Sequence, residues 1–132
     1  MENKPICEID DDGNKRWYNE FGLYHREDGP AVEFYHGGKQ WWVDGQLHRL
    51  DGPAVEYKDG TKEWHVNGKL HRLDGPAKIY SDGDKEWHIN DYYVTDEIAQ
   101  WAKDNDIDID NLTEDDKLLI KLVWADYSGR IK

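Results

Sequence analysis

The segment His48-Arg49-Leu50-Asp51-Gly52-Pro53-Ala54 decides the architecture of this chain, because it recurs at a fixed interval. Its copies lie 23 residues before it and 23 residues after it: His25-Arg26-Glu27-Asp28-Gly29-Pro30-Ala31 and His71-Arg72-Leu73-Asp74-Gly75-Pro76-Ala77. A short unit can bury its apolar face only against its neighbours, so a constant period predicts an extended array of stacked units. An active site is rarely built three times in succession, which favours a structural role for the motif.

Matching residues extend from the motif in both directions and define the units. The four prolines of the chain are expected at one repeat position: Pro5, Pro30, Pro53 and Pro76. The last two units match closely and the first two loosely. The N-terminal unit requires two extra residues, one in the turn at Asp10–Asp12 and one near Glu20–Phe21. We therefore predict four units over residues 5–94.

Each unit contains two predicted strands and two predicted turns. Asp59-Gly60 separates the two strands and Asn67-Gly68 follows the second, and such dipeptides accept the positive φ values of tight hairpin turns. Side chains alternate with period two, so Trp64 and Val66 share one face of the second strand. These patterns predict an antiparallel, twisted β-meander with two strands per unit, whose tryptophan-rich face is the core.

The motif itself predicts the corner between one unit and the next. Pro53 has a restricted φ and no amide donor, which suits the first residue of a strand, and Gly52 accepts whatever dihedral the corner requires. Arg49 and Asp51 are two residues apart, so their side chains can pair on one side of an extended segment. Asp51 can also accept backbone N–H groups.

The array is expected to end where a fourth His-Arg pair would stand, because the chain has Val94-Thr95 there. Thr95 is typical of a helix N-cap, and Thr113 begins a weak capping box. We predict helices over residues 96–104 and 114–127 that close the open end of the sheet or cover one face. Gly129 is the expected C-terminal stop.

Composition places the chain in a broad class. It is predicted to be a single domain, residues 1–132, mainly β with a small α part: a repeat array over 5–94 and a helical cap over 95–132. The formal net charge of −12 argues against direct nucleic-acid binding, which requires clustered Lys and Arg. A single cysteine, Cys7, suits a reducing compartment. With no signal peptide and no membrane-spanning stretch, we expect a cytoplasmic protein.

The chemistry-bearing side chains are predicted to be structural, with no catalytic residue, cofactor or metal site. One repeat separates His25, His48 and His71 by roughly 10 Å, too far to share one zinc ion. His65 and His88 form a second such row. Residues 104–110 alternate acids but lack the glycine and glutamate of a calcium loop, so we interpret them as a solvated linker.

Positions where the units disagree are the best candidates for function. Tyr35, Trp42 and Ile79 stand where another unit has Lys58, His65 and Glu56, and we place all three on the face opposite Trp64. Large apolar groups there are covered by the helices or form a partner surface. The candidate partner-binding residues are Tyr35, Trp42, Glu56, His65, Ile79, His88, Asp104, Asp106 and Asp108.

The period, the paired hairpin strands and the pattern Trp-x-x-Asn-Gly-Lys-Leu-His, with Gly-Pro and Tyr-x-x-Gly, resemble MORN-type repeats. The variant with His-Arg-x-Asp-Gly-Pro-Ala units in proteins of tailed phages and giant viruses is especially similar. The resemblance covers residues 5–94 and implies a protein-interaction scaffold without a chemistry of its own. The chain departs from MORN repeats by one residue between Trp64 and Gly68 and by the inserted Arg-Leu-Asp. Its negative charge does not favour lipid binding.

The leading hypothesis is a non-enzymatic scaffold that binds another protein and, given the phage resemblance, inhibits a host factor inside the host cell. An alternative within that class is an acidic nucleic-acid mimic, such as an anti-defence or anti-CRISPR inhibitor that binds a basic host factor. Another class is a nucleotide-binding sponge, in which Trp, His and Arg hold a small ligand. No feature of the sequence requires an enzyme.

Overall fold

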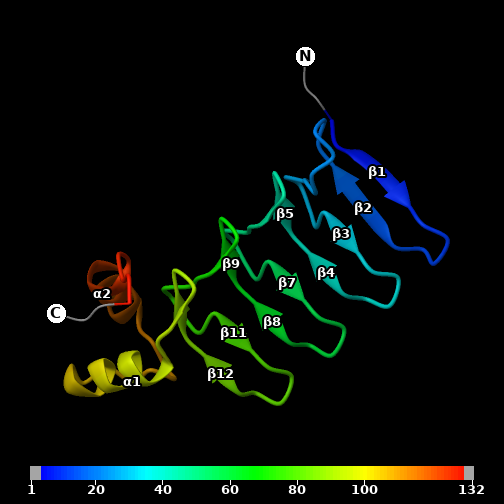
Figure 1. Ribbon diagram of the computed structural model, residues 1–132. Helices are drawn as coiled ribbons and strands as arrows, with labels where there is room; N and C mark the ends of the chain where they lie inside the picture. The colour runs from blue at the N-terminus through cyan, green and yellow to red at the C-terminus, as the bar shows by residue number, and fades with distance from the viewer. Residues whose placement is uncertain (1–3, 130–132) are drawn as a thin grey trace.

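The computed structural model describes residues 4–129 and has an antiparallel sheet along its length (Figure 1). Its eight strands are β1 (Ile6–Ile9), β2 (Lys15–Tyr18), β3 (Val32–Glu33), β4 (Lys39–Gln40), β7 (Val55–Glu56), β8 (Lys62–Glu63), β11 (Lys78–Ile79) and β12 (Lys85–Glu86), adjacent in that order. Three hairpins accompany it: β5 (Trp42–Val43) with β6 (Gln46–Leu47), β9 (His65–Val66) with β10 (Lys69–Leu70), and β13 (His88–Ile89) with β14 (Tyr92–Tyr93). The predicted fold class, mainly β with a small α part, is confirmed.

The second predicted strand of each unit is divided at its tryptophan. The N–H of Trp64 donates to the carbonyl of Ala77 in the next unit (2.7 Å), while its carbonyl accepts from the N–H of His71 in its own unit (3.0 Å). Trp41 makes the same two bonds with Ala54 and His48. The chain therefore leaves the large sheet at each tryptophan and forms a separate hairpin. The prediction of two strands per unit is wrong, because these units contribute four short ones.

The predicted hairpin turn at Asn67-Gly68 is confirmed. Asn67 and Gly68 both have positive φ, 51° and 80°, and they join β9 to β10. In the last hairpin Asn90 and Asp91 take the same conformation, at 52° and 71°, without a glycine.

The first unit differs from the others in one of the two predicted ways. The backbone bond from Asn19 to Leu23 encloses a longer turn than those of the later hairpins, so the extra residue near Glu20–Phe21 is confirmed. In the other turn the N–H of Asp10 donates to the carbonyl of Asn14, the same five-residue span as in the later units. No extra residue lies in that turn, and the prediction there is wrong.

Because this turn has no extra residue, each residue of β1 occupies a repeat position one earlier than predicted. Cys7 is paired across the strands with Trp17, the place that Ala31 holds relative to Trp41. Pro5 consequently lies one residue outside the row formed by the other three prolines.

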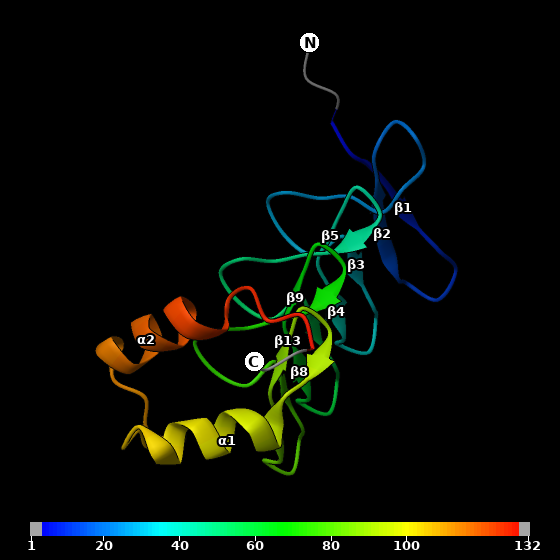
Figure 2. The ribbon, with the colours of Figure 1, turned by 60° about the vertical axis from the view of Figure 1, so that its left-hand side comes forward.

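Two helices close the C-terminal end of the array. Helix α1 spans Thr95–Asp104 and α2 spans Glu114–Trp124, and Figure 2 shows both on the same side of the sheet. The predicted capping box at Thr113 is confirmed, with Asp116 as its partner. Helix α2 ends at Trp124, three residues earlier than predicted. There the N–H of Tyr127 donates to the carbonyl of Trp124 in a turn. The buried apolar cluster comprises Trp87, Ile89, Val94, Ile98, Ile120 and Trp124.

Thr95 ends the array but is not an N-cap. Val94 occupies the N-cap position, and Thr95 is the first helical residue. Its hydroxyl accepts the backbone N–H of Trp87 at 2.9 Å. In the preceding units the tryptophan N–H donates to an alanine carbonyl of the next unit, as Trp64 does to Ala77. Thr95 thus replaces the acceptor that a further unit would provide.

We expect Thr95→Val to lower the free energy of unfolding by about 1–3 kcal/mol, because the N–H of the buried Trp87 would lose its acceptor. Urea unfolding followed by tryptophan fluorescence measures this change. Thr95→Ser is the matched control, since it keeps the hydroxyl and should remain within about 0.5 kcal/mol of the original protein. Equal stability of the valine and serine variants would contradict the assignment.

Candidate functional site

Each motif forms a loop that is closed by its arginine. In the central copy, Arg49 Nε donates to Asp51 Oδ1 at 3.0 Å and Nη1 donates to the Pro53 carbonyl at 3.0 Å. The guanidinium carbon lies 3.9 Å from the centroid of the Trp41 ring. The predicted pairing of Arg49 with Asp51 is confirmed. The same set of contacts recurs at Arg26 over Trp17 and at Arg72 over Trp64.

The glycine of the motif leaves space for the arginine rather than supplying a left-handed dihedral angle. Gly52 has no left-handed φ, but a Cβ there would lie 2.9 Å from the guanidinium carbon of Arg49. At Gly75 the corresponding distance to Arg72 is 2.7 Å. A side chain at this position would displace the arginine from its tryptophan.

The histidine that begins each motif accepts a hydrogen bond from the next unit. His48 Nδ1 accepts the backbone N–H of Asn67 at 3.0 Å, and the neighbouring N–H of Gly68 donates to the Leu47 carbonyl at 2.9 Å. His25 and His71 make the equivalent bonds to Asp44 and Asn90, each at 3.0 Å. These bonds confirm a structural role for this histidine row. Burial lowers the pKa of His71.

Clefts lie between successive motif loops on the tryptophan side of the sheet. The first open cleft lies between the loops at 25–31 and 48–54, is lined by Trp41 and Val43, and has a volume of about 680 Å³. The second open cleft lies between the loops at 48–54 and 71–77, is lined by Trp64 and Val66, and measures about 540 Å³. Leu50 lines both open clefts and is 80% exposed.

The helical cap occupies the place that follows the third loop. Trp87 and Ile89 correspond to the tryptophan and valine of the open clefts, and they are buried against Ile98, Ile120 and Trp124. Leu73, the counterpart of the exposed Leu50, packs against the same cluster. Apolar side chains of the cap therefore bury Trp87 and Ile89 more completely than their half-buried counterparts in the two units before.

The opposite face carries a repeated polar network in which the histidine is buried. His65 Nε2 lies 2.9 Å from Glu63 Oε1, and the Tyr57 hydroxyl donates to Glu63 Oε2 at 3.0 Å. The bond to His65 is the main reason that the pKa of Glu63 falls to about 2. His88, Glu86 and Tyr80 form the same arrangement one unit later.

Three predicted site residues belong to that network or to its replacement in the preceding unit. His65 and His88 are only 8% and 9% exposed, so their rings offer little surface to a partner. Trp42 stands in the row of His65, and its Nε1 donates to Gln40 Oε1 at 2.9 Å, as the histidine rings bond to Glu63 and Glu86. The replacement of His by Trp is thus matched by the replacement of Glu by Gln. Trp42 also contacts the ring of Tyr24, with centroids 5.3 Å apart.

Ile79 lies on the tryptophan side, and the prediction that placed it on the opposite face is wrong. Its cross-strand partner is Lys62, which lies two positions before Trp64 and therefore on the same face of the extended chain that leads to it. Ile79 lines a cleft together with Trp87 and Ala99, so the cap covers it. Glu56 is on the same side as Ile79, half-buried between the strands of Lys39 and Lys62.

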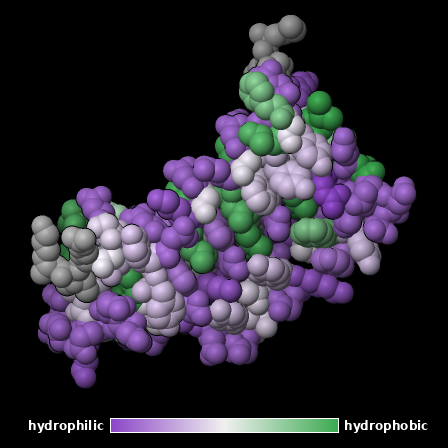
Figure 3. Space-filling model, in the orientation of Figure 1, coloured by the Kyte–Doolittle hydropathy of each residue, from purple (hydrophilic) through white to green (hydrophobic). Residues whose placement is uncertain are grey.

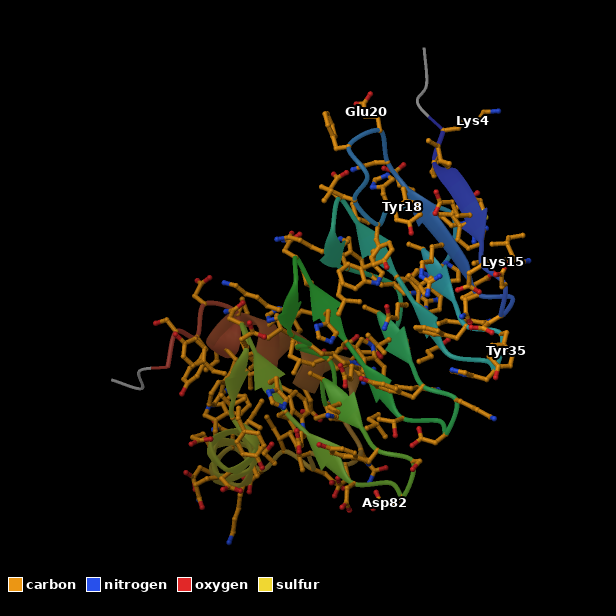
Figure 4. All side chains as sticks on the ribbon, turned by 45° about the vertical axis from the view of Figure 1, so that its right-hand side comes forward. Lys4, Lys15, Tyr18, Glu20, Tyr35 and Asp82 are labelled. Atoms are coloured by element: carbon orange, nitrogen blue, oxygen red, sulfur yellow. The ribbon has the colours of Figure 1, made fainter. Side chains whose placement is uncertain are left out.

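None of the remaining predicted residues lines the two open clefts. Tyr35 is 70% exposed in the turn between β3 and β4, and Figure 4 shows it with Asp82 along the turn edge of the large sheet. Asp104, Asp106 and Asp108 are exposed at the end of α1 and in the linker to α2. Between residues 4 and 129, His, Cys, Asp and Glu side chains form no group of three that could hold a metal ion.

Most of the surface seen in Figure 3 is hydrophilic, and apolar residues form an interrupted band along the middle of the array. Neither helix in the described part of the chain has the length and apolar character needed to cross a membrane.

Sequence reasoning did not identify the open clefts or the role of Leu50. The signal was present, because Val43 and Val66 follow the tryptophans at a spacing of two and Leu50 stands where the first motif has Glu27. The sequence did not predict that the loops fold over this face and leave clefts between them. Comparison with protein-family models, with curated proteins and with solved structures found no match to this chain.

The stability of the protein should decrease below about pH 6.5 because of His71. The folded state holds the pKa of this ring below its ordinary value of 6.5, so the unfolded chain binds the proton more readily. Its contribution is complete above pH 6.5 and is lost as the pH falls toward the lower, folded-state pKa. Protonation of Nδ1 would also remove the acceptor for Asn90.

Urea unfolding at pH 7.5 and pH 5.5 tests this expectation. The original protein should lose stability between the two values, and His71→Gln should be less stable at pH 7.5 but lose less on acidification. An equal loss in both proteins would show that His71 does not cause the pH dependence.

Proposed function

We propose that this chain is a non-enzymatic protein-interaction scaffold that docks another protein in its two open clefts. The observation that carries the proposal is that equivalent positions in successive units differ in how they are covered. In the last unit the chain's own helices bury Trp87 and Ile89, while the equivalent Trp64 and Val66 remain in an open cleft. A partner that presents apolar side chains in the same way would gain the same burial.

The position of Leu50 supports this assignment. An exposed leucine by itself requires no explanation, but this one lies between two clefts that each have a tryptophan and a valine. Together they place apolar side chains along the middle of the array, interrupted and bordered by the charged groups of the loops. Such an arrangement, an apolar centre with a polar rim, is that of protein–protein interfaces.

A small aromatic ligand fits the clefts less well. A nucleotide base would stack on an indole ring, but the guanidinium of Arg49 covers Trp41 at 3.9 Å and that of Arg72 covers Trp64 at 4.0 Å. Each arginine is also fixed in place by its bonds to its aspartate and to a proline carbonyl, so its guanidinium is not free to turn toward a phosphate. We therefore favour a protein partner over a nucleotide.

The charge distribution favours a basic partner and supports nucleic-acid mimicry as a second candidate function. Residues 95–116 contain nine carboxylates and one lysine, a net charge of −8 out of −12 for the chain. This part of the chain forms α1, the linker and the first turn of α2, at the end of the array next to the second open cleft, which Lys121 of α2 also lines. An acidic surface of this kind accelerates association with a positively charged partner.

Affinity capture with three variants tests the docking surface. Leu50→Glu and Val66→Glu place a charge in the clefts and should weaken binding of the captured partner at least about tenfold. Tyr35→Glu is the matched control, because it adds the same charge at an exposed site on the turn edge and should bind like the original protein. Calorimetric titration of the purified partner provides the affinities, and circular dichroism verifies that each variant is folded.

The reverse pattern, loss of binding with Tyr35→Glu alone, would contradict docking in the clefts. Raising the salt concentration distinguishes the two candidate functions. Binding to the clefts should persist in high salt, whereas a nucleic-acid mimic should lose affinity steeply.

A further inference from the structure

The two edges of the large sheet differ in whether other parts of the chain lie next to them. At the C-terminal edge, Lys85 and Trp87 share a cleft with Ala99 and Asp110 of the cap, and Lys85 Nζ lies 4.0 Å from Asp110 Oδ1. At the N-terminal edge, all four residues of β1 are exposed, including Ile6 at 59% and Ile9 at 64%. Figure 1 shows β1 at the end of the array farthest from the helices.

The outer side of β1 carries unpaired backbone groups. The N–H of Asp10 donates to the carbonyl of Asn14, which sets the alternation of bonded pairs in the β1–β2 hairpin. Glu8 therefore exchanges its bonds with Arg16, and the backbone groups of Cys7 and Ile9 point away from β2. Pro5, the preceding residue of this outward row, has no N–H to donate, so the edge offers the backbone groups of Cys7 and Ile9 and the Pro5 carbonyl to another strand.

We propose that β1 pairs antiparallel with β1 of a second copy of this chain, with Cys7 on the twofold axis. The two eight-stranded sheets then form one continuous sheet. Antiparallel pairing centred on Cys7 places Lys4 of each copy opposite the acidic turn that begins at Asp10 of the other. Centring the pairing on Glu8 would instead oppose two carboxylates, and parallel pairing would oppose like charges along the strand.

The negative charge of the whole chain does not prevent this association. The nine carboxylates of residues 95–116 belong to the cap region, at the opposite end of the array from β1. Exposed charges separated by more than about 10 Å are largely screened at ordinary ionic strength. At the edge itself, the two attractions between Lys4 and the turn that begins at Asp10 oppose the repulsion between the two Glu8 side chains, which are diagonal neighbours in this register.

Light scattering after size exclusion measures the assembly directly. We expect about 31 kDa, twice the chain mass of 15.6 kDa, for the original protein and for Cys7→Ser. Cys7→Pro should be a folded monomer, because the outward N–H at this position is lost and no bond to β2 is removed. Lys4→Glu, which does not alter the strand, should raise the dimer dissociation constant at least about tenfold.

Cross-linking of the single cysteine tests the register. A bonded antiparallel pair has Cα atoms about 5.5 Å apart, so a short bismaleimide should join the two copies through Cys7 in the original protein. A monomer at all accessible concentrations would overturn the proposal and leave the edge to an extended segment of another protein. A dimer that persists in both Cys7→Pro and Lys4→Glu, or that is not cross-linked at Cys7, would place the interface elsewhere and overturn it as well.

Discussion

The contact between an arginine guanidinium and a tryptophan ring, made in each of the motif loops, is the interaction on which the rest of the structure depends. It places Arg49 against Trp41 while Asp51 and the Pro53 carbonyl take its N–H groups. A cation on an indole ring is worth roughly 0.5–2 kcal/mol, more where water is excluded. The contact holds the loop over the sheet, and that position creates both the corner between units and the walls of the clefts.

The end of the array follows from the same requirement. Where no further loop exists, the last tryptophan needs a hydroxyl acceptor for its N–H and apolar side chains for its ring, and Thr95 and the two helices provide them. The cap thus indicates what the tryptophan side of the sheet accepts. In the open clefts an arginine takes part of this role, and the tryptophan and valine stay half-buried. We therefore look for a partner there rather than on the opposite face, where Glu63 and His65 are bonded to each other and nearly buried.

Local patterns predicted much of this fold because the interactions involved are local. Positive-φ turns at Asn67-Gly68, the pairing of Arg49 with Asp51 and the capping box at Thr113 each lie within a few residues of the chain. Three other features depend on pairing between units. These are the division of each strand at its tryptophan, the bond from Trp87 to Thr95, and the side of the sheet on which Ile79 lies. The clefts were missed for the same reason, since their walls come from loops 23 residues apart.

A double-mutant cycle between Arg49 and Trp41 tests most directly whether this contact holds the array together. The free energies of unfolding of Arg49→Met, Trp41→Leu and the double variant are compared with that of the original protein. A coupling of about 1 kcal/mol or more between the two substitutions is the predicted result. Additive effects, with no coupling beyond about 0.3 kcal/mol, would contradict the central role of the contact.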